Sequence, residues 1–178
     1  QLRWQKDANQ AQTRFDYDSL GRQTTRYLNG VAQAHWVFDT RIKGALSTES
    51  RDELVKNYYY DSKARVIKET SNIHHLATTK SFAMEYGYDG HYGRVKGVRY
   101  PTGELLGLNY DQFGYSTSDV NPNNNHAIYR SILGINPQGK ITKQAYGNDL
   151  YTNHHYTRSG DSARVCVNSA SLCEADAS

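Results

Sequence analysis

The sequence has few of the residues that fill a thick hydrophobic core. Only 37% of its 178 residues are hydrophobic, and it contains one Met, 3 Pro and 4 Phe. Soluble globular domains usually have an apolar share of about 45–50%. The chain nevertheless has 15 Tyr and a net charge of only +3, whereas disordered chains are poor in aromatics and rich in net charge. We therefore expect a folded but thin structure.

Long hydrophobic runs and blocks of like charge are also missing. No stretch approaches the roughly 18 consecutive apolar residues of a membrane-spanning helix, and the first residues do not resemble a signal peptide. The 21 basic and 18 acidic residues are interspersed, which is not the pattern of a nucleic-acid-binding surface. The sequence predicts no membrane span and no nucleic-acid partner. Because it begins with Gln1 and its single Met is Met84, we expect it to be an excerpt of a longer product.

Motifs of known catalytic, metal and cofactor sites are absent. The sequence has no HExxH, no paired CxxC, no EF-hand spacing and no nucleotide-binding glycine motif. Two pairs of histidines are adjacent, His74–His75 and His154–His155, and adjacent residues of a strand point to opposite faces. We expect no catalytic residues, no metal ligands and no cofactor, and therefore no enzyme activity in this chain.

Two cysteines, Cys166 and Cys173, enclose six residues near the end of the chain. In an oxidising compartment they would close a small disulfide loop, whereas in the cytosol they would remain thiols. Their spacing leaves both states open.

What the sequence does contain is a repeat. An aromatic residue followed by Asp, and a few residues later by Gly-Arg or a near equivalent, recurs every 21 to 28 residues, which is typical of repeat architectures. The motif residues are Tyr17, Asp18, Gly21, Arg22, Phe38, Asp39, Tyr60, Asp61, Arg65, Tyr88, Asp89, Gly93, Arg94, Tyr110, Asp111 and Gly114, and weaker copies begin at Ile135 and Tyr156.

Each copy has the properties of a β-hairpin turn. Aromatic residues two positions apart, such as Tyr58 and Tyr60, share one face of a strand. The Asp starts the turn by accepting backbone N–H groups, and the Gly supplies the positive φ that closes the loop. The sequence predicts an all-β array of antiparallel hairpins over residues 1–165, with about seven degenerate copies and a polar tail at 166–178. Residues 47–57 are interpreted as a connection, Pro101–Gly103 as a turn and Ser118–Asn125 as a loop.

The motif copies resemble the YD-repeat, or Rhs-repeat, family over roughly residues 10–165. The segment from Trp36 to Thr40, followed by Gly44-Ala45-Leu46, also resembles a variant common in its toxin-complex and polymorphic-toxin members. The resemblance implies a strip of antiparallel hairpins wound in a spiral, a β-solenoid-like wall segment. In bacterial members this wall forms a shell that encloses a toxin domain. It also implies a secreted or cell-surface protein, with the rest of the same long chain and the enclosed toxin domain as partners. A toxin domain and a self-cleavage motif are not recognisable in these residues.

Exposed aromatic residues suggest a second function of a different class. Trp36, Tyr92 and Tyr115 are candidates for binding a glycan or a receptor, because such rings offer an apolar face and a polar edge. The chain would then be a carbohydrate-binding or adhesion module. In the structural interpretation, the motif aromatics instead stack between neighbouring hairpins, which stabilises the sheet.

Overall fold

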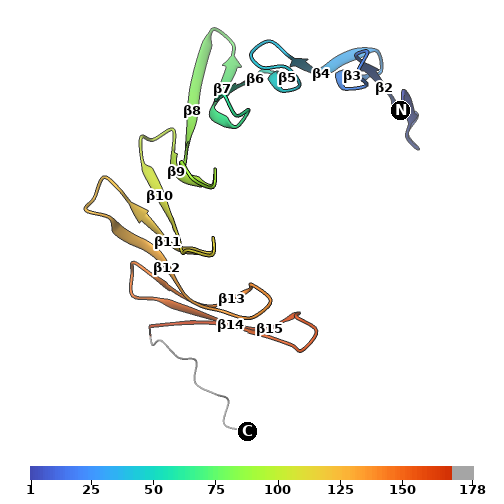
Figure 1. Cartoon of the computed structure of the whole chain (residues 1–178). Helices are drawn as coiled ribbons and strands as arrows, with labels where there is room; N and C mark the ends of the chain where they lie inside the picture. Colours follow the sequence, from blue (N-terminus) through green and yellow to red (C-terminus); the bar gives the residue numbers. More distant parts are fainter. Residues whose placement is uncertain (170–178) are drawn as a thin grey trace. The chain divides into compact units, whose positions relative to one another are not determined.

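The computed structural model describes residues 1–169, and all of their regular structure is β-strand (Figure 1). The strands are β1 (Trp4–Lys6), β2 (Gln12–Tyr17), β3 (Gln23–Leu28), β4 (Val31–Phe38), β5 (Leu46–Arg51), β6 (Leu54–Tyr60), β7 (Val66–His75), β8 (Thr78–Tyr88), β9 (Val95–Arg99), β10 (Leu105–Tyr110), β11 (Ser116–Asn121), β12 (Ala127–Ile135), β13 (Ile141–Tyr146), β14 (Tyr151–Tyr156) and β15 (Ser162–Asn168). The predicted all-β class is confirmed. The described residues contain no helix with the length and apolar character of a membrane span.

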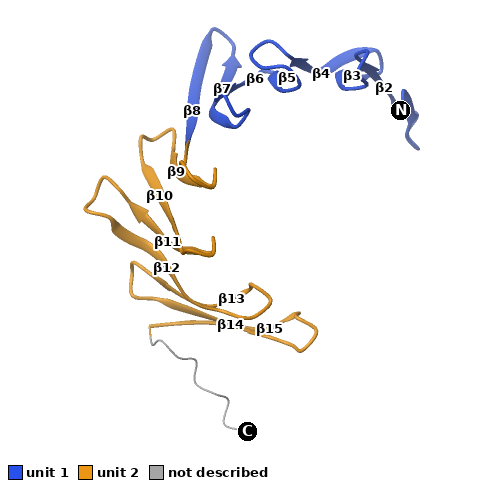
Figure 2. Ribbon diagram, viewed as in Figure 1, with its two compact units in different colours: residues 1–86 blue, residues 87–178 orange. Residues whose placement is uncertain are grey.

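The chain divides into two units, the first ending at Tyr86 and the second beginning at Gly87 (Figure 2). Unit 1 holds β1 to β7 and most of β8, and unit 2 holds the end of β8 and β9 to β15. Within each unit the strands lie in sequence order, and each pairs antiparallel with the next. Each unit is therefore a meander of hairpins, as the repeat predicts.

The repeated motif marks the ends of alternate strands. Tyr17 is the last residue of β2, Phe38 of β4, Tyr60 of β6, Tyr88 of β8 and Tyr110 of β10. Because strand direction alternates along a meander, every second turn lies at the same edge of the sheet. We call this the motif edge of each unit. It comprises residues 18–22, 39–45 and 61–65 in unit 1, and residues 89–94, 111–115, 136–140 and 157–161 in unit 2.

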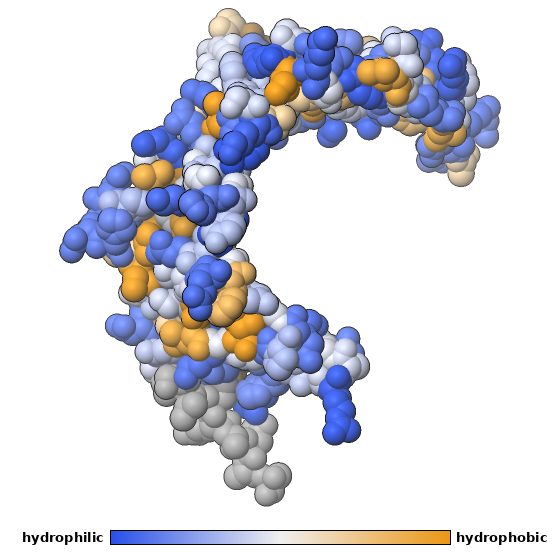
Figure 3. Space-filling view, viewed as in Figure 1, coloured by the Kyte–Doolittle hydropathy of each residue, from blue (hydrophilic) through white to orange (hydrophobic). Residues whose placement is uncertain are grey.

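Burial of apolar side chains is sparse, as the composition predicts. Among the described residues, the buried hydrophobic side chains are Ala34 and Val120, each 5% exposed, while the most buried residue is the polar Ser47. On the face in view, Figure 3 shows hydrophilic residues around separate hydrophobic patches. The sheets therefore depend on strand hydrogen bonds and on side-chain contacts along the strands more than on a shared core.

Residues 47–57 are not a connection, so that prediction is wrong. They belong to β5 and β6, which pair in register from Thr48 with Asn57 to Arg51 with Leu54. Within residues 47–57 the apolar residues are the adjacent Leu54 and Val55, and the half-buried positions include the polar pairs Thr48 with Asn57 and Glu49 with Lys56. The Thr48 hydroxyl, for example, donates to the Asn57 side-chain oxygen at 3.0 Å. The sequence of this segment therefore lacks the alternation of apolar and polar residues that predicts a half-buried strand.

Two other expectations concern loops and boundaries. The turn at Pro101–Gly103 joins β9 to β10, as predicted. The loop expected at Ser118–Asn125 is shorter, because β11 runs to Asn121 and pairs with β12 as far as Ala127. At the end of the array β15 runs to Asn168, past the expected boundary at residue 165.

Candidate functional site

The turns of the motif edge share one backbone geometry. The Asp18 N–H donates to the Arg22 carbonyl at 2.9 Å, and the Gly21 N–H donates to the Asp18 carbonyl at 3.0 Å. The fourth turn residue has a left-handed backbone, with φ of 80° at Gly21. The same pair of backbone bonds recurs in the turns that start at Asp61, Asp111, Asn136 and Thr157. A type I turn followed by a left-handed residue is a common three-residue hairpin loop, and it places a bulge at the end of the strand.

The motif Asp side chain accepts hydrogen bonds from groups of its own turn. Asp18 Oδ1 accepts the N–H groups of Leu20 and Arg22, each at 2.9 Å, and Asp18 Oδ2 accepts Arg22 Nε at 2.7 Å. Asp61 makes the equivalent three contacts, and the amide oxygen of Asn136 accepts two N–H groups in the same way. A short side-chain oxygen at the first turn position explains the recurrent Asp.

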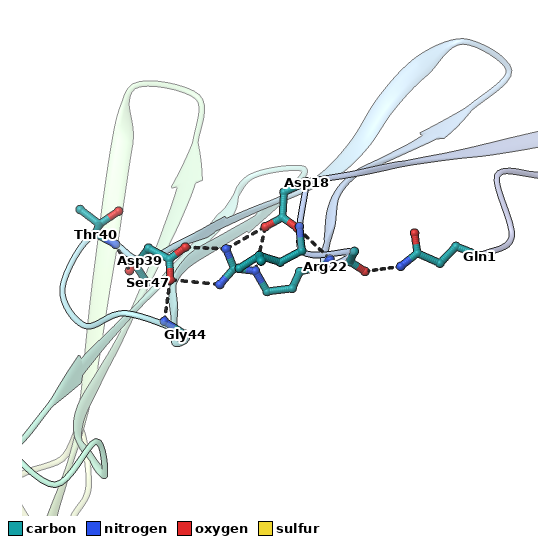
Figure 4. A network of polar contacts seen from close by, with 9 residues as sticks. Gln1, Asp18, Arg22, Asp39, Thr40, Gly44 and Ser47 are labelled. Carbon is teal, nitrogen blue, oxygen red and sulfur yellow. Dashed lines mark hydrogen bonds and ion pairs between the residues drawn. The ribbon is translucent and has the colours of Figure 1, made fainter.

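The motif arginine joins one repeat to the next (Figure 4). Arg22 Nη1 donates to Asp39 Oδ1 at 3.0 Å and Nη2 to Asp39 Oδ2 at 2.5 Å, a two-point geometry that suits guanidinium and carboxylate. The Arg22 guanidinium also lies 4.5 Å from the centre of the Phe38 ring. A single side chain therefore contacts the Asp of its own turn, and both the aromatic residue and the Asp of the following motif.

The same contact recurs in unit 2. The Arg94 guanidinium lies 4.5 Å from the centre of the Tyr110 ring, and Lys140 Nζ lies 5.2 Å from the centre of the Tyr156 ring. In all three pairs the aromatic residue follows the cation by 16 positions along the chain. Attraction between a cation and an aromatic face explains why a basic residue ends the motif.

These contacts lower the pKa of several motif carboxyls. Hydrogen bonds from the Arg22 guanidinium hold the pKa of Asp39 at about 2, against an ordinary value of 3.8. The backbone N–H of Arg22 lowers the pKa of Asp18, and the backbone N–H of Arg65 lowers that of Asp61. The Arg94 side chain lowers the pKa of Asp89. The carboxylates are thus held in their charged form by the groups that donate to them.

Motif tyrosines have a partner that the sequence did not reveal. The Tyr60 hydroxyl donates to the Leu46 carbonyl at 2.6 Å, and the Tyr110 hydroxyl donates to the Val95 carbonyl at 2.8 Å. The hydroxyls of Tyr17 and Tyr156 bond to Leu2 and Ile141 in the same way, at 2.7 and 2.9 Å. The bonds of Tyr60, Tyr110 and Tyr156 run from the end of one strand to the first residue of the preceding strand, and the bond of Tyr17 runs to Leu2, just before β1. A backbone carbonyl carries no sequence signal, so only the 14- or 15-residue separation recurs.

Two predicted motif positions depart from the common turn. The turn at Asp39 is longer, since its N–H donates to the Ala45 carbonyl and its Oδ1 accepts the Gly44 N–H at 2.6 Å. The turn at Asp89 has one extra residue before Arg94, and Gly93 there has φ of 71°. Both still place a carboxylate against an arginine, so the length of the loop varies while its polar contacts persist.

The three candidate ligand-binding aromatics lie in different surroundings. Tyr92 is 67% exposed and Tyr115 49% exposed, both in turns of unit 2. Arg94 stacks against Tyr92 at 4.5 Å. Trp36 lies in unit 1, where it is half-buried and lines a depression that also includes Glu49 and Lys56. Of the three, Trp36 alone is set among charged side chains that face the same depression.

Two further points of the sequence analysis concern metal ligands and the two cysteines. In residues 1–169 no three His, Cys, Asp or Glu side chains are grouped to hold a metal ion. Cys166 lies on β15, whereas Cys173 lies outside the described residues. The disulfide and the two thiols therefore stay the alternatives that the sequence leaves open for Cys166 and Cys173.

Comparison with known proteins finds similarity in fold alone. No protein-family model and no curated protein matches the chain. Among solved structures, the Photorhabdus luminescens Tc holotoxin pore superposes with a TM-score of 0.74 at 11% identity, over 93% of this chain and 9% of that chain. The crystal structure of TcdB2-TccC3 gives a TM-score of 0.74 at 11% identity, over 93% and 10%. The form without the hypervariable C-terminal region gives 0.73 at 11% identity, over 93% and 9%.

The matched solved chains are much longer than this one, which spans about a tenth of their length. The YD-repeat resemblance of the sequence pointed to toxin-complex proteins, and the structural likeness leads to the same group. The turn geometry, the repeat-to-repeat arginine and the superposition agree on one conclusion: this chain has the hairpin-repeat fold found within Tc toxin structures.

Proposed function

We propose that this chain is a wall segment of a YD-repeat shell in a large secreted bacterial toxin, and that the shell encloses and shields a toxin domain. The observation that carries the proposal is the superposition of nearly the whole chain, 93%, on about a tenth of each Tc toxin chain. A segment that matches about a tenth of a longer chain is suited to being a part of a wall.

The structure of the units supports a role as a barrier. Every described strand pairs with its sequence neighbour within a unit, so the backbone offers few sites to a protease except at the turns. On the motif edge, the turns that start at Asp18, Asp61 and Asp89 are closed by carboxylate and arginine contacts. The terminal strands β1 and β15 each have one paired side among the described residues. Open sheet edges favour pairing with further strands. Neighbouring repeats of a longer chain would supply such strands.

Protease protection in the native gene product tests this proposal. We expect mass spectrometry to find a product several times longer than 178 residues. A part of it beyond this segment should resist protease in the native state and be digested after denaturation. A native product of this length alone would contradict the proposal, because so few hairpins enclose no folded domain. A longer product whose remaining parts are digested at the rate of an unshielded domain would contradict the shielding role.

A binding or adhesion module is the second candidate, and one observation favours it. Trp36 lies at a depression with charged neighbours, which Tyr92 and Tyr115 do not share. Trp36 lies in unit 1, and Tyr92 and Tyr115 lie in unit 2. A wall segment and a binding site on its face are compatible functions.

A further inference from the structure

The turn between β3 and β4 in unit 1 consists of Asn29 and Gly30, the one Asn-Gly pair of the sequence. Both residues have a left-handed backbone, with φ of 50° and 83°. Leu28 and Val31 pair on either side of them, so the turn is the two-residue hairpin loop that Asn-Gly favours. Asn29 and Gly30 are both exposed. Water and hydroxide ions therefore reach the amide groups of this turn.

The Asn29 side chain is held in place by the neighbouring strand β2. The Asn29 N–H donates to the Gln12 carbonyl at 2.8 Å, and the Gln12 N–H donates to Asn29 Oδ1 at 2.9 Å. A donor at Oδ1 stabilises the negative charge that develops on this oxygen when a nucleophile attacks Cγ. The contact with Gln12 therefore orients the Asn29 amide and favours attack at its Cγ.

The Gly30 nitrogen, next to Asn29 along the backbone, is free to act as that nucleophile. Among residues 1–169, no hydrogen bond involves the Gly30 N–H. Gly30 has no side chain, and a Cβ built there would meet no atom within 4 Å, so the space beside the turn is open. A bonded N–H would be held in place, and a side chain would obstruct the approach to Cγ. Neither obstacle is present at Gly30.

We propose that Asn29 is a site of spontaneous deamidation in the folded chain. Solvent base removes the Gly30 N–H proton, and the nitrogen forms a bond with Asn29 Cγ. The Cγ–Nδ2 bond breaks, Nδ2 leaves as ammonia, and a succinimide ring remains. Water then opens the ring at either carbonyl, which gives aspartate or isoaspartate at position 29. The net reaction consumes water and releases ammonia, and nothing is oxidised or reduced. This inference does not depend on the shell function.

Deamidation changes the turn both in charge and in backbone length. Aspartate adds a negative charge, and isoaspartate inserts an extra carbon atom into the main chain. A two-residue hairpin loop has a fixed geometry, and the hydrogen bonds between Asn29 and Gln12 depend on it. The β3–β4 turn is therefore a place where unit 1 changes covalently as a molecule ages.

Asp89-Gly90 is the one Asp-Gly pair of the sequence and provides an internal control. The same ring closure there would expel water in place of ammonia. However, Asp89 Oδ1 accepts the N–H groups of His91 and Gly93 at 3.1 and 3.0 Å, and Asp89 Oδ2 accepts a side-chain N–H of the motif arginine at 2.8 Å. A charged carboxylate held by donors is a poor target for a nucleophile. We therefore expect Asp89 not to react in the folded chain.

Peptide mapping of the native gene product tests the proposal. One sample is kept folded in mildly alkaline buffer, and a parallel sample is kept in urea. Trypsin releases Asn29 in the peptide from Tyr27 to Arg41, where it is the single Asn. Mass spectrometry measures conversion of amide to acid in this peptide, and enzymatic methylation measures isoaspartate at both Asn29 and Asp89.

In the folded sample we expect acid to accumulate at Asn29, with isoaspartate there exceeding that at Asp89 by about tenfold or more. In urea both positions should react, because the contacts of Asp89 are lost. An amide that persists at Asn29 in the folded sample would overturn the proposal, whatever happens in urea. Equal isoaspartate formation at Asn29 and Asp89 in the folded sample would show that the turn contacts do not matter, and would overturn it too.

Two matched variants identify the attacking group. Gly30→Ala places a Cβ beside the Gly30 nitrogen and should slow the conversion of Asn29 by about tenfold or more. Gly103→Ala should leave the conversion unchanged, because Gly103 has φ of 88° and equally open surroundings but lies in the β9–β10 turn of unit 2. Circular dichroism confirms that each variant keeps its β-sheet signal. An unchanged or faster conversion in Gly30→Ala would overturn the role of the Gly30 nitrogen.

Discussion

Arg22 and Asp39 form a two-point ion pair between one motif turn and the next, with contacts of 3.0 and 2.5 Å. Arg22 also holds Asp18 in its own turn at 2.7 Å. The guanidinium therefore connects two loops that are separated by β3 and β4. Neighbouring repeats of unit 1 are joined by this side chain in addition to the ladder of strand hydrogen bonds.

Replacing Arg22 with lysine should weaken this connection. Lysine keeps the charge but has no planar fork, so it cannot bond both Asp18 and both oxygens of Asp39. Because the pair is partly exposed, we expect Arg22→Lys to lower the melting temperature by only about 1–3 °C. Arg26→Lys, on β3 of the same repeat, is the matched control and should change it less. Equal effects of the two substitutions would contradict the role assigned to Arg22.

Stability should fall in acid below the ordinary carboxyl pKa. The folded pKa of Asp39 is about 2, against 3.8 ordinarily, and those of Asp18, Asp61 and Asp89 are lowered as well. In the window between these values the unfolded chain binds more protons than the folded chain, so acid favours unfolding. These groups should contribute nothing to a change in melting temperature between pH 7 and 5, and a loss between about pH 4 and 2. Thermal melts across this range measure it.

Asp39→Asn provides the control for that pH dependence. The variant keeps an oxygen acceptor but has no proton to gain, so its loss of stability between about pH 4 and 2 should be smaller than that of the unaltered chain. An identical acid profile for both proteins would show that Asp39 does not contribute.

The left-handed turn position predicts a stabilising substitution at Ala64. Its φ is 62°, where the other turns of this type on the motif edge have glycine. A left-handed backbone costs an L-residue about 1–2 kcal/mol, and the greater freedom of unfolded glycine offsets part of the gain. Ala64→Gly should raise the free energy of unfolding by about 0.5–1 kcal/mol, and Gly114→Ala should lower it by a similar amount. Urea denaturation measures both, and a destabilising Ala64→Gly would refute the turn assignment.

Removal of one hydroxyl tests the tyrosine contact. Tyr60→Phe deletes the hydrogen bond to the Leu46 carbonyl while keeping the ring. The free energy of unfolding should fall by about 0.5–1.5 kcal/mol, the usual net worth of such a bond. Tyr59→Phe is the matched control, because the Tyr59 ring stacks on Arg41 at 4.2 Å through its face rather than through its hydroxyl. Equal losses in the two variants would contradict the contact.

Local chemistry explains which turns the sequence revealed. Asp18 and Gly21 lie within one loop, so their roles follow from turn chemistry without any knowledge of the rest of the fold. The turns at Asp7–Ala11 and Tyr146–Leu150 have the same backbone bonds but were not predicted as copies. Their left-handed residues are Gln10 and Asp149, with φ of 66° and 61°, so the glycine signal is missing there.

Contacts between repeats depend on register, which composition does not specify. The motif predicted that a basic residue such as Arg22 opens the outgoing strand after several turns, but not that Arg22 reaches Asp39. Trp36 was predicted as a candidate binding residue, whereas its neighbour Glu49 was not, because Glu49 lies opposite Trp36 only through the pairing of β4 with β5. The residues of one repeat can thus be predicted from the sequence, whereas the residues that they contact in the next repeat cannot.

The tyrosine, carboxylate and arginine contacts of the motif edge all join residues no more than 17 positions apart. A gene encoding such a protein can gain or lose a whole repeat and leave the others correctly bonded, so unequal recombination is an easy route to longer or shorter relatives.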